Sequence, residues 1–105
     1  MNTSTATGKV VVKRSSSEVR IAVKGPFNHA LRQQFRESYY SYPANTHYIV
    51  DFSDVTMMDS SAMGMLIQLR KHAGDDKAEI SLVNLSPRLS GLIKASGMST
   101  LFDLF

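Results

Sequence analysis

The sequence predicts an α/β domain with a mixed four- to five-stranded sheet and three to four helices. Two runs rich in β-branched residues open the chain, and strand-like apolar runs then alternate with segments of helical periodicity. Strands that alternate with helices are usually parallel, because each helix carries the chain back across the sheet. The length of 105 residues suits a single domain, which we assign to residues 9–105.

The N-terminal part of the chain predicts a tail followed by a hairpin. Residues 1–8 are rich in Ser and Thr and are expected to form a flexible tail. The β-branched runs at residues 10–12 and 19–23 are joined by the polar segment 14–18. So short a link predicts an antiparallel hairpin. Gly25-Pro26 is expected to end the second strand, since proline cannot donate to a strand ladder.

A first helix and a buried strand follow the hairpin. Asn28 is a favourable N-cap. The apolar face of this helix is expected to comprise Leu31, Phe35, Ser38 and Tyr39. Pro43 and Asn45 then end the helical pattern. Residues 48–52 are nearly continuous in apolar character, which is typical of a strand covered on both faces.

A connection over residues 54–59 leads to a second helix that begins at Ser60 or Ser61. The core residues of this helix are expected to be Ala62, Met65, Leu66 and Leu69. The helix is expected to end before Gly74, because glycine readily adopts the left-handed conformation that follows a helix.

The C-terminal part predicts one further strand and a third helix. Residues 79–83 form the strand, and Ser86-Pro87 provides a capping serine with proline in the first helical turn. The apolar stripe of the helix comprises Leu89, Leu92, Ile93 and Ser96, and Gly97 closes it. Residues 101–105 fit either a short strand or the start of a fourth helix, and the sequence does not decide between them.

Composition argues against several classes of function. The chain has no cysteine, so disulfides and Cys-based zinc sites are excluded, which suits the reducing cytoplasm where we expect the protein. Its three histidines lack metal-ligand spacing. No apolar run approaches the roughly 20 residues that cross a bilayer, so no membrane insertion is expected. A Gly-x-Ser-x-Gly elbow and Gly-rich phosphate loops are also absent. We therefore expect neither an enzyme nor a bound cofactor or metal.

The charge pattern gives no sign of a nucleic-acid surface. The net charge is +3, from 12 basic and 9 acidic residues, and the basic residues are scattered along the chain. Nucleic-acid binding proteins more often concentrate their basic residues on one stripe. We interpret the charges as an ordinary solvated surface.

One segment carries the most specific signal. The strand reads Asp51-Phe52-Ser53-Asp54-Val55, and the next helix opens with Asp59-Ser60-Ser61-Ala62-Met63-Gly64. This combination resembles the STAS family, the domain of anti-sigma factor antagonists and of the cytoplasmic tails of sulphate transporters, whose usual signature is a "DLS.V" strand and then "DSSGLG". The resemblance covers residues 9–105 and includes the "LVN" strand end at residues 82–84. Ala62 and Met63 depart from the commoner Gly and Leu.

The resemblance implies a phosphorylation-controlled switch between protein partners. The family pattern places the phosphoacceptor on Ser60, with Ser61 as second choice. Its expected partner is a bacterial serine kinase that is also an anti-sigma factor, or a response regulator with a phosphatase module. We expect the chain itself to be a monomer or a weak dimer. The partner-binding surface is expected to comprise Asp54, Met58, Asp59, Ser60, Ser61 and Met63.

Two alternatives stay open at the level of sequence. Asp59 or Ser60 can simply be a helix N-cap, which is the commonest role of these residue types before an apolar helix. Some stand-alone members of the family are instead subunits of lipid-transport ABC complexes that bind the ATPase. A helix N-terminus nevertheless tolerates a phosphate well, because its free N–H groups favour negative charge.

Overall fold

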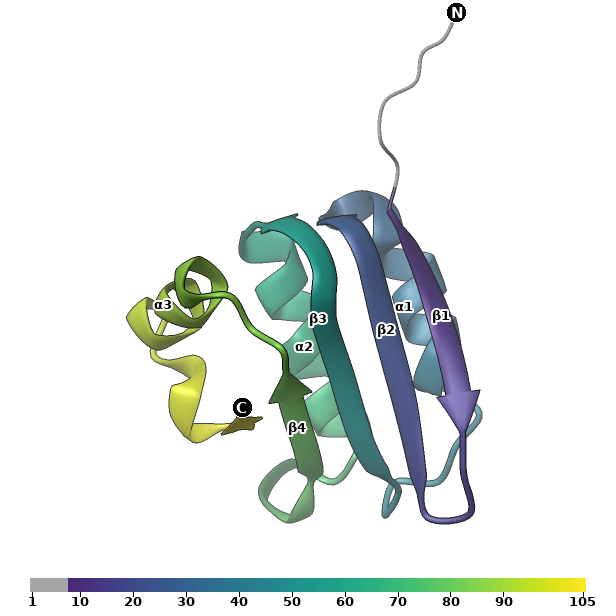
Figure 1. The fold of residues 1–105 in the computed structure, drawn as a ribbon. Coiled ribbons are helices and arrows are strands. Elements are labelled where there is room, and N and C mark those ends of the chain that lie inside the picture. Colours follow the sequence, from purple (N-terminus) through teal and green to yellow (C-terminus); the bar gives the residue numbers. More distant parts are fainter. Residues whose placement is uncertain (1–7) are drawn as a thin grey trace, which may run out of the picture.

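In the computed structural model, which describes residues 8–105, five strands form one sheet in the order β1-β2-β3-β4-β5 (Figure 1). The strands are β1 (Lys9–Arg14), β2 (Glu18–Phe27), β3 (His47–Met58), β4 (Glu79–Val83) and β5 (Asp103–Leu104). β1 and β2 form the predicted antiparallel hairpin, and the remaining neighbours are parallel. The predicted mixed sheet is confirmed. Of the tail predicted over residues 1–8, all but Gly8 lies outside the described residues.

The helices are α1 (Arg32–Tyr39), α2 (Ser60–His72) and α3 (Pro87–Ala95), and three short 3-10 helices accompany them: η1 (His29–Leu31), η2 (Asp75–Lys77) and η3 (Met98–Thr100). Figure 1 shows α1 and α2 side by side on one face of the sheet, while α3 lies past β4, at the end of the sheet opposite β1. The two crossovers that connect β2 to β3 and β3 to β4 therefore lie on the same side.

This arrangement corrects the prediction that the strand at residues 48–52 is covered on both faces. Tyr48, Val50 and Phe52 are at most 1% exposed and belong to the core under α1 and α2. Ile49 and Asp51, which point to the opposite face, are half-buried. The nearly continuous apolar run hid an alternation, because Ile49 is apolar although no crossover helix covers its face.

The predicted connection at residues 54–59 is also wrong, since β3 continues to Met58. Its second half pairs with the end of β2, from Lys24↔Asp54 to Phe27↔Met58. Gly25-Pro26 does not end β2. Register shifts occur between Ala22 and Lys24 and between Gly25 and Pro26, and Gly25 has a φ of +80° that glycine adopts readily. The bulge accommodates proline within the strand.

The ends of α1 and α2 follow from their caps. The Asn28 side chain accepts a hydrogen bond from the Ala30 N–H at 3.0 Å, so it caps η1, and α1 begins only at Arg32. α2 begins at Ser60 as predicted, and its predicted core residues are buried. Gly74, with φ +113°, follows the end of α2. Its left-handed conformation is the one that the sequence predicts.

The C-terminal segment settles the question that the sequence left open. Asp103 and Leu104 pair in parallel with β4, so residues 101–105 contribute a short strand. In α3 the predicted stripe is confirmed for Leu89 and Ile93, which are buried. Leu92 is 36% exposed, and Ser96 is exposed as the C-cap of the helix.

Candidate functional site

The start of α2 is organised by the side chain of Asp59. This residue has an extended backbone and is the N-cap of the helix. Its Oδ1 atom accepts hydrogen bonds from the Ser61 hydroxyl at 2.6 Å and from the Ala62 N–H at 3.1 Å. The hydrogen bond from the Ser61 hydroxyl lowers the pKa of the Asp59 carboxyl, and backbone N–H groups, including that of Ala62, lower it further. The site therefore carries a fixed negative charge beside Ser60 at neutral pH.

The two serines after Asp59 differ in what their hydroxyl groups do. The Ser61 hydroxyl is committed to Asp59, and the Ser61 side chain is half-buried. Ser60 is exposed as the first residue of α2, and within residues 8–105 its hydroxyl makes no hydrogen bond. Of the two hydroxyl groups, that of Ser60 is therefore the more accessible to a modifying enzyme.

The structure corrects one member of the predicted partner surface. Met58 is 6% exposed, because it occupies an inward position of β3 opposite Phe27. Met57 points the other way and is 41% exposed. A loop at residues 54–59 gave no reason to distinguish the two methionines, whereas the alternation of a strand does. Met57 is thus the surface methionine that sequence reasoning missed.

The other predicted members have intermediate positions. Met63 is half-buried and packs against the core from α2, so part of its side chain is available beside Ser60. The carboxylate of Asp54 is 58% exposed and forms an ion pair with Lys24 Nζ at 2.8 Å on β2. The structure thus brings Asp59, Ser60, Ser61 and Met63 together at the start of α2, with Asp54 further back along β3.

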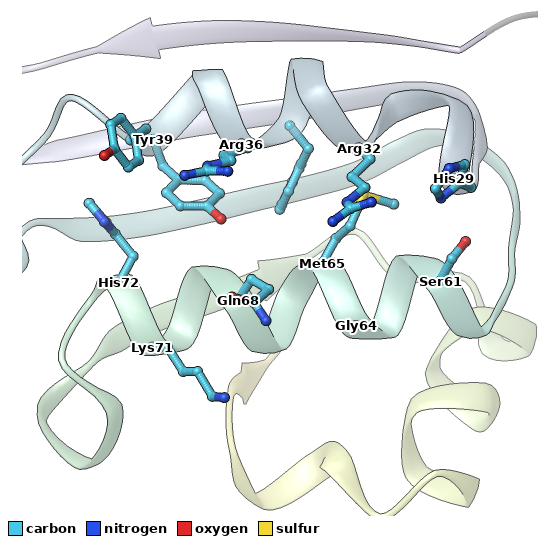
Figure 2. A pocket seen from close by; sticks show the side chains of 12 residues that line it. His29, Arg32, Arg36, Tyr39, Ser61, Gly64, Met65, Gln68, Lys71 and His72 are labelled. Atoms are coloured by element: carbon cyan, nitrogen blue, oxygen red, sulfur yellow. The ribbon is translucent and has the colours of Figure 1, made fainter.

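A groove between α1 and α2 adjoins this site. It has a volume of about 690 Å³. Figure 2 shows that His29 and Ser61 lie at one end and His72 at the other, with Arg32 and Arg36 extending from α1. His29 and His72, which are far apart in sequence, therefore border one surface feature. Sequence reasoning missed this groove because its residues come from helices separated by a strand.

Within residues 8–105 no group of three or more His, Cys, Asp or Glu side chains is placed to hold a metal ion. None of the helices in this part of the chain is long and apolar enough to span a membrane.

The comparisons with known proteins define the family. Residues 9–105 match the family model of the STAS domain. A STAS-domain containing protein of Pseudomonas aeruginosa (strain UCBPP-PA14) is 39% identical over 88 residues, which cover 83% of this chain and 87% of the relative. The chain belongs to the STAS domain family.

Solved structures agree with this assignment at the level of the fold. The anti-sigma factor antagonist SpoIIAA in its unphosphorylated form has a TM-score of 0.75 at 19% identity, covering 91% of this chain and 87% of its own. An anti-sigma factor antagonist from Mycobacterium paratuberculosis reaches 0.79 at 16% identity, covering 94% and 86%. The structure of this chain is thus a SpoIIAA-like STAS fold.

Proposed function

We propose that this chain is a protein-binding switch of the anti-sigma factor antagonist type, controlled by phosphorylation of Ser60. The observation that carries the proposal is the contrast between the two serines. Ser60 presents an exposed hydroxyl at the start of α2, whereas Ser61 donates its hydroxyl hydrogen bond to Asp59. A kinase can reach Ser60 without breaking the cap of the helix.

The fold is expected to tolerate a phosphate on Ser60. The group is added at the N-terminus of a 13-residue helix, where the helix dipole favours negative charge by about 0.3–1 kcal/mol. The side-chain hydrogen bonds that hold the helix start are accepted by Asp59, and Ser60 takes no part in them. The modification therefore changes the surface and leaves the interior contacts in place.

The same phosphate is expected to release a partner that covers this surface. It adds about −1.5 to −2 charge at pH 7. Asp59, whose pKa is lowered by its hydrogen bond from Ser61, already holds a negative charge next to it. An interface that accommodates a neutral hydroxyl would then face like charge and desolvation. A loss of about 1.4 kcal/mol weakens binding tenfold, so a few such losses make an effective release signal.

Relatives support the proposed class of partner. SpoIIAA, an anti-sigma factor antagonist, has been solved in unphosphorylated and phosphorylated forms, and the latter has a TM-score of 0.70 to this chain. We infer a cytoplasmic serine kinase that acts as an anti-sigma factor, or a response regulator with a phosphatase module, as the partner. Transcription is then the process that this chain regulates.

The test is a pull-down from native lysate with wild-type bait and the Ser60→Asp, Ser60→Ala and Ser16→Asp variants. Ser16 is exposed in the hairpin connection, so Ser16→Asp matches the added charge away from the site. We expect Ser60→Asp to lose a kinase, anti-sigma factor or regulator that the other three baits retain. Phosphosite mapping of the chain purified from its host is expected to place the phosphate on Ser60.

Three outcomes would contradict the proposal. Equal retention of such a partner by all four baits would leave Asp59-Ser60-Ser61 as a helix cap without a switch. Equal retention of an ABC-transporter ATPase would instead support the transport-subunit function. Phosphate on Ser61 rather than Ser60 would move the acceptor and refute the argument from hydroxyl accessibility.

A further inference from the structure

We propose that the groove between α1 and α2 binds an acidic, amphipathic segment of a partner protein. The inference rests on the proposed function, because it assigns a second set of contacts to the partner that Ser60 controls. The contacting segment of that partner would carry carboxylates beside apolar residues.

The groove carries unbalanced positive charge. The groove is lined by Arg32, Arg36 and Lys71 and by two histidines, and none of its lining residues is acidic. Arg20, Lys24 and Arg70, outside the groove, each form an ion pair with an aspartate. Within residues 8–105 the three cations of the groove form no such pair, and the seven preceding residues contain no Asp or Glu.

Apolar side chains form the floor of the groove. Phe35, Tyr39 and Met65 line the groove and are between 1% and 8% exposed. Tyr40, which also lines it, is 62% exposed, and the Arg36 guanidinium lies 4.9 Å from the centroid of its ring. An apolar floor with arginines along one side fits a segment that has apolar residues on one face and carboxylates beside them.

The groove is open next to Gly64 on α2. Gly64 lines the groove, and a Cβ atom added there meets nothing within 4 Å. Figure 2 shows Arg32 and Arg36 extending from α1 into the space between the two helices. Because they are four residues apart, they lie on one side of α1 and can contact successive turns of an acidic helix.

The groove is continuous with the phosphoacceptor site. Ser61 borders one end of the groove and donates its hydroxyl hydrogen bond to Asp59. A phosphate on Ser60 would therefore stand next to the Ser61 end of the groove. At about 0.15 M salt, charges interact over roughly 8 Å, so this phosphate repels carboxylates in the first part of the groove. Repulsion of the same segment explains how one phosphate releases a partner held along two helices.

The test uses the full chain and a defined probe, a 16-residue amphipathic peptide of Leu, Ala and Glu, with a matched peptide in which every Glu is replaced by Gln. Amide shifts of the isotope-labelled chain are followed by NMR during titration. We expect the Glu peptide to shift the amides of Arg32, Arg36, Gly64 and Gln68, and its Kd to rise with salt. The Gln peptide is expected to bind at least tenfold more weakly.

Two pairs of variants separate charge from shape. Arg32→Glu/Arg36→Glu reverses the groove charge, while Lys13→Glu/Lys77→Glu makes the same change in net charge at exposed positions outside the lining. Gly64→Gln fills the groove without adding charge, and Gly91→Gln on α3, where an added Cβ also meets no atom, is its control. We expect the groove variants to weaken the Glu peptide about tenfold or more and the controls to bind like wild type.

The inference would be overturned by any of three results. These are amide shifts outside the groove, equal binding of the two peptides, and wild-type affinity of both groove variants. These outcomes are distinct from a failure of the proposed function. If Ser60→Asp retains every partner in the pull-down while the groove variants lose the peptide, the switch is refuted and the groove stands. If Ser60→Asp releases its partner while the groove variants bind the peptide normally, the groove is refuted and the switch stands.

Discussion

Acid is expected to destabilise this fold through one carboxylate, that of Asp51 on the sheet face opposite α1 and α2. Asp51 Oδ1 accepts hydrogen bonds from the Asn84 amide at 3.0 Å and the Ser53 N–H at 2.9 Å. Its Oδ2 accepts one from Arg20 at 3.0 Å. The carboxylate thus joins β2, β3 and the end of β4, where Asn84 has a left-handed φ of +60°.

The size of the effect follows from the pKa of Asp51. Burial by itself raises this pKa, but the hydrogen bonds from Asn84, Ser53 and Arg20 outweigh it and lower the pKa from 3.8 to about 2. A change of one in pKa is equivalent to about 1.4 kcal/mol, so the ionised carboxylate stabilises the fold by about 2 kcal/mol. Because the folded pKa is the lower one, this stabilisation is complete above about pH 5 and is lost as the pH falls from 4 towards 2.

The assay is urea denaturation followed by far-UV circular dichroism at pH 6 and at pH 2.5, on wild type and Asp51→Asn. We expect the variant to be less stable by about 2 kcal/mol at pH 6, and the difference to shrink to about a third of that at pH 2.5, where the carboxylate of the folded chain is still partly ionised. Asp54→Asn is the matched control, since Asp54 is 58% exposed and exchanges the same charge. Its stability is expected to stay within about 0.5 kcal/mol of wild type at pH 6.

A difference between wild type and Asp51→Asn that stays constant from pH 6 to pH 2.5 would refute this reasoning. It would mean that the variant disturbs packing and that protonation of Asp51 contributes nothing to acid unfolding. An equally large loss at pH 6 in Asp54→Asn would show that the effect belongs to overall charge and not to the three hydrogen bonds.

Three further pairs of substitutions test the fold by thermal and urea unfolding. Asp59→Ala is expected to lower the free energy of unfolding by about 1 kcal/mol, because α2 loses its N-cap, while Asp59→Asn retains most of the stability. Equal losses in the two variants would contradict the capping role. Gly74→Ala is expected to cost about 1–2 kcal/mol at its φ of +113°, whereas Gly91→Ala in α3 should be neutral or stabilising; a neutral Gly74→Ala would argue against the left-handed turn. Met58→Ala is expected to cost about 2–5 kcal/mol and Met57→Ala less than about 0.5; the reverse order would contradict the strand register.

Local patterns were sufficient to predict most of the elements. The caps at Ser86 and Asp59, the apolar spacing in α2 and the glycine after it are signals read within a few residues, and the structure places them as predicted. The hairpin was predictable for the same reason, since its two strands are joined by a short polar link. The family signature then located the candidate site at the start of α2.

Errors arose where the deciding contact is distant in sequence. Whether residues 54–58 form a loop or a strand depends on whether β2 reaches them, and β2 does so through a bulge at Gly25-Pro26 that the sequence suggested was a stop. The assignment of Met58 to the surface was a consequence of that error. The basic residues looked scattered because Arg32, Arg36 and Lys71 belong to two helices that only the parallel crossovers bring together.

The start of α2 separates the residue that holds the fold from the residue that is proposed to carry the signal. Asp59 makes both side-chain hydrogen bonds of the cap, so Ser61 is bound and Ser60 is left exposed at the same turn. Had Ser60 been the cap, its phosphorylation would have disturbed the helix together with the interface. Ala62 strengthens the separation, because a fully buried alanine supports the first turn of the helix better than glycine would. In the proposed switch, a helix start capped by Asp59, beside groove cations that form no ion pair within residues 8–105, would let one phosphate alter binding while the fold remains intact.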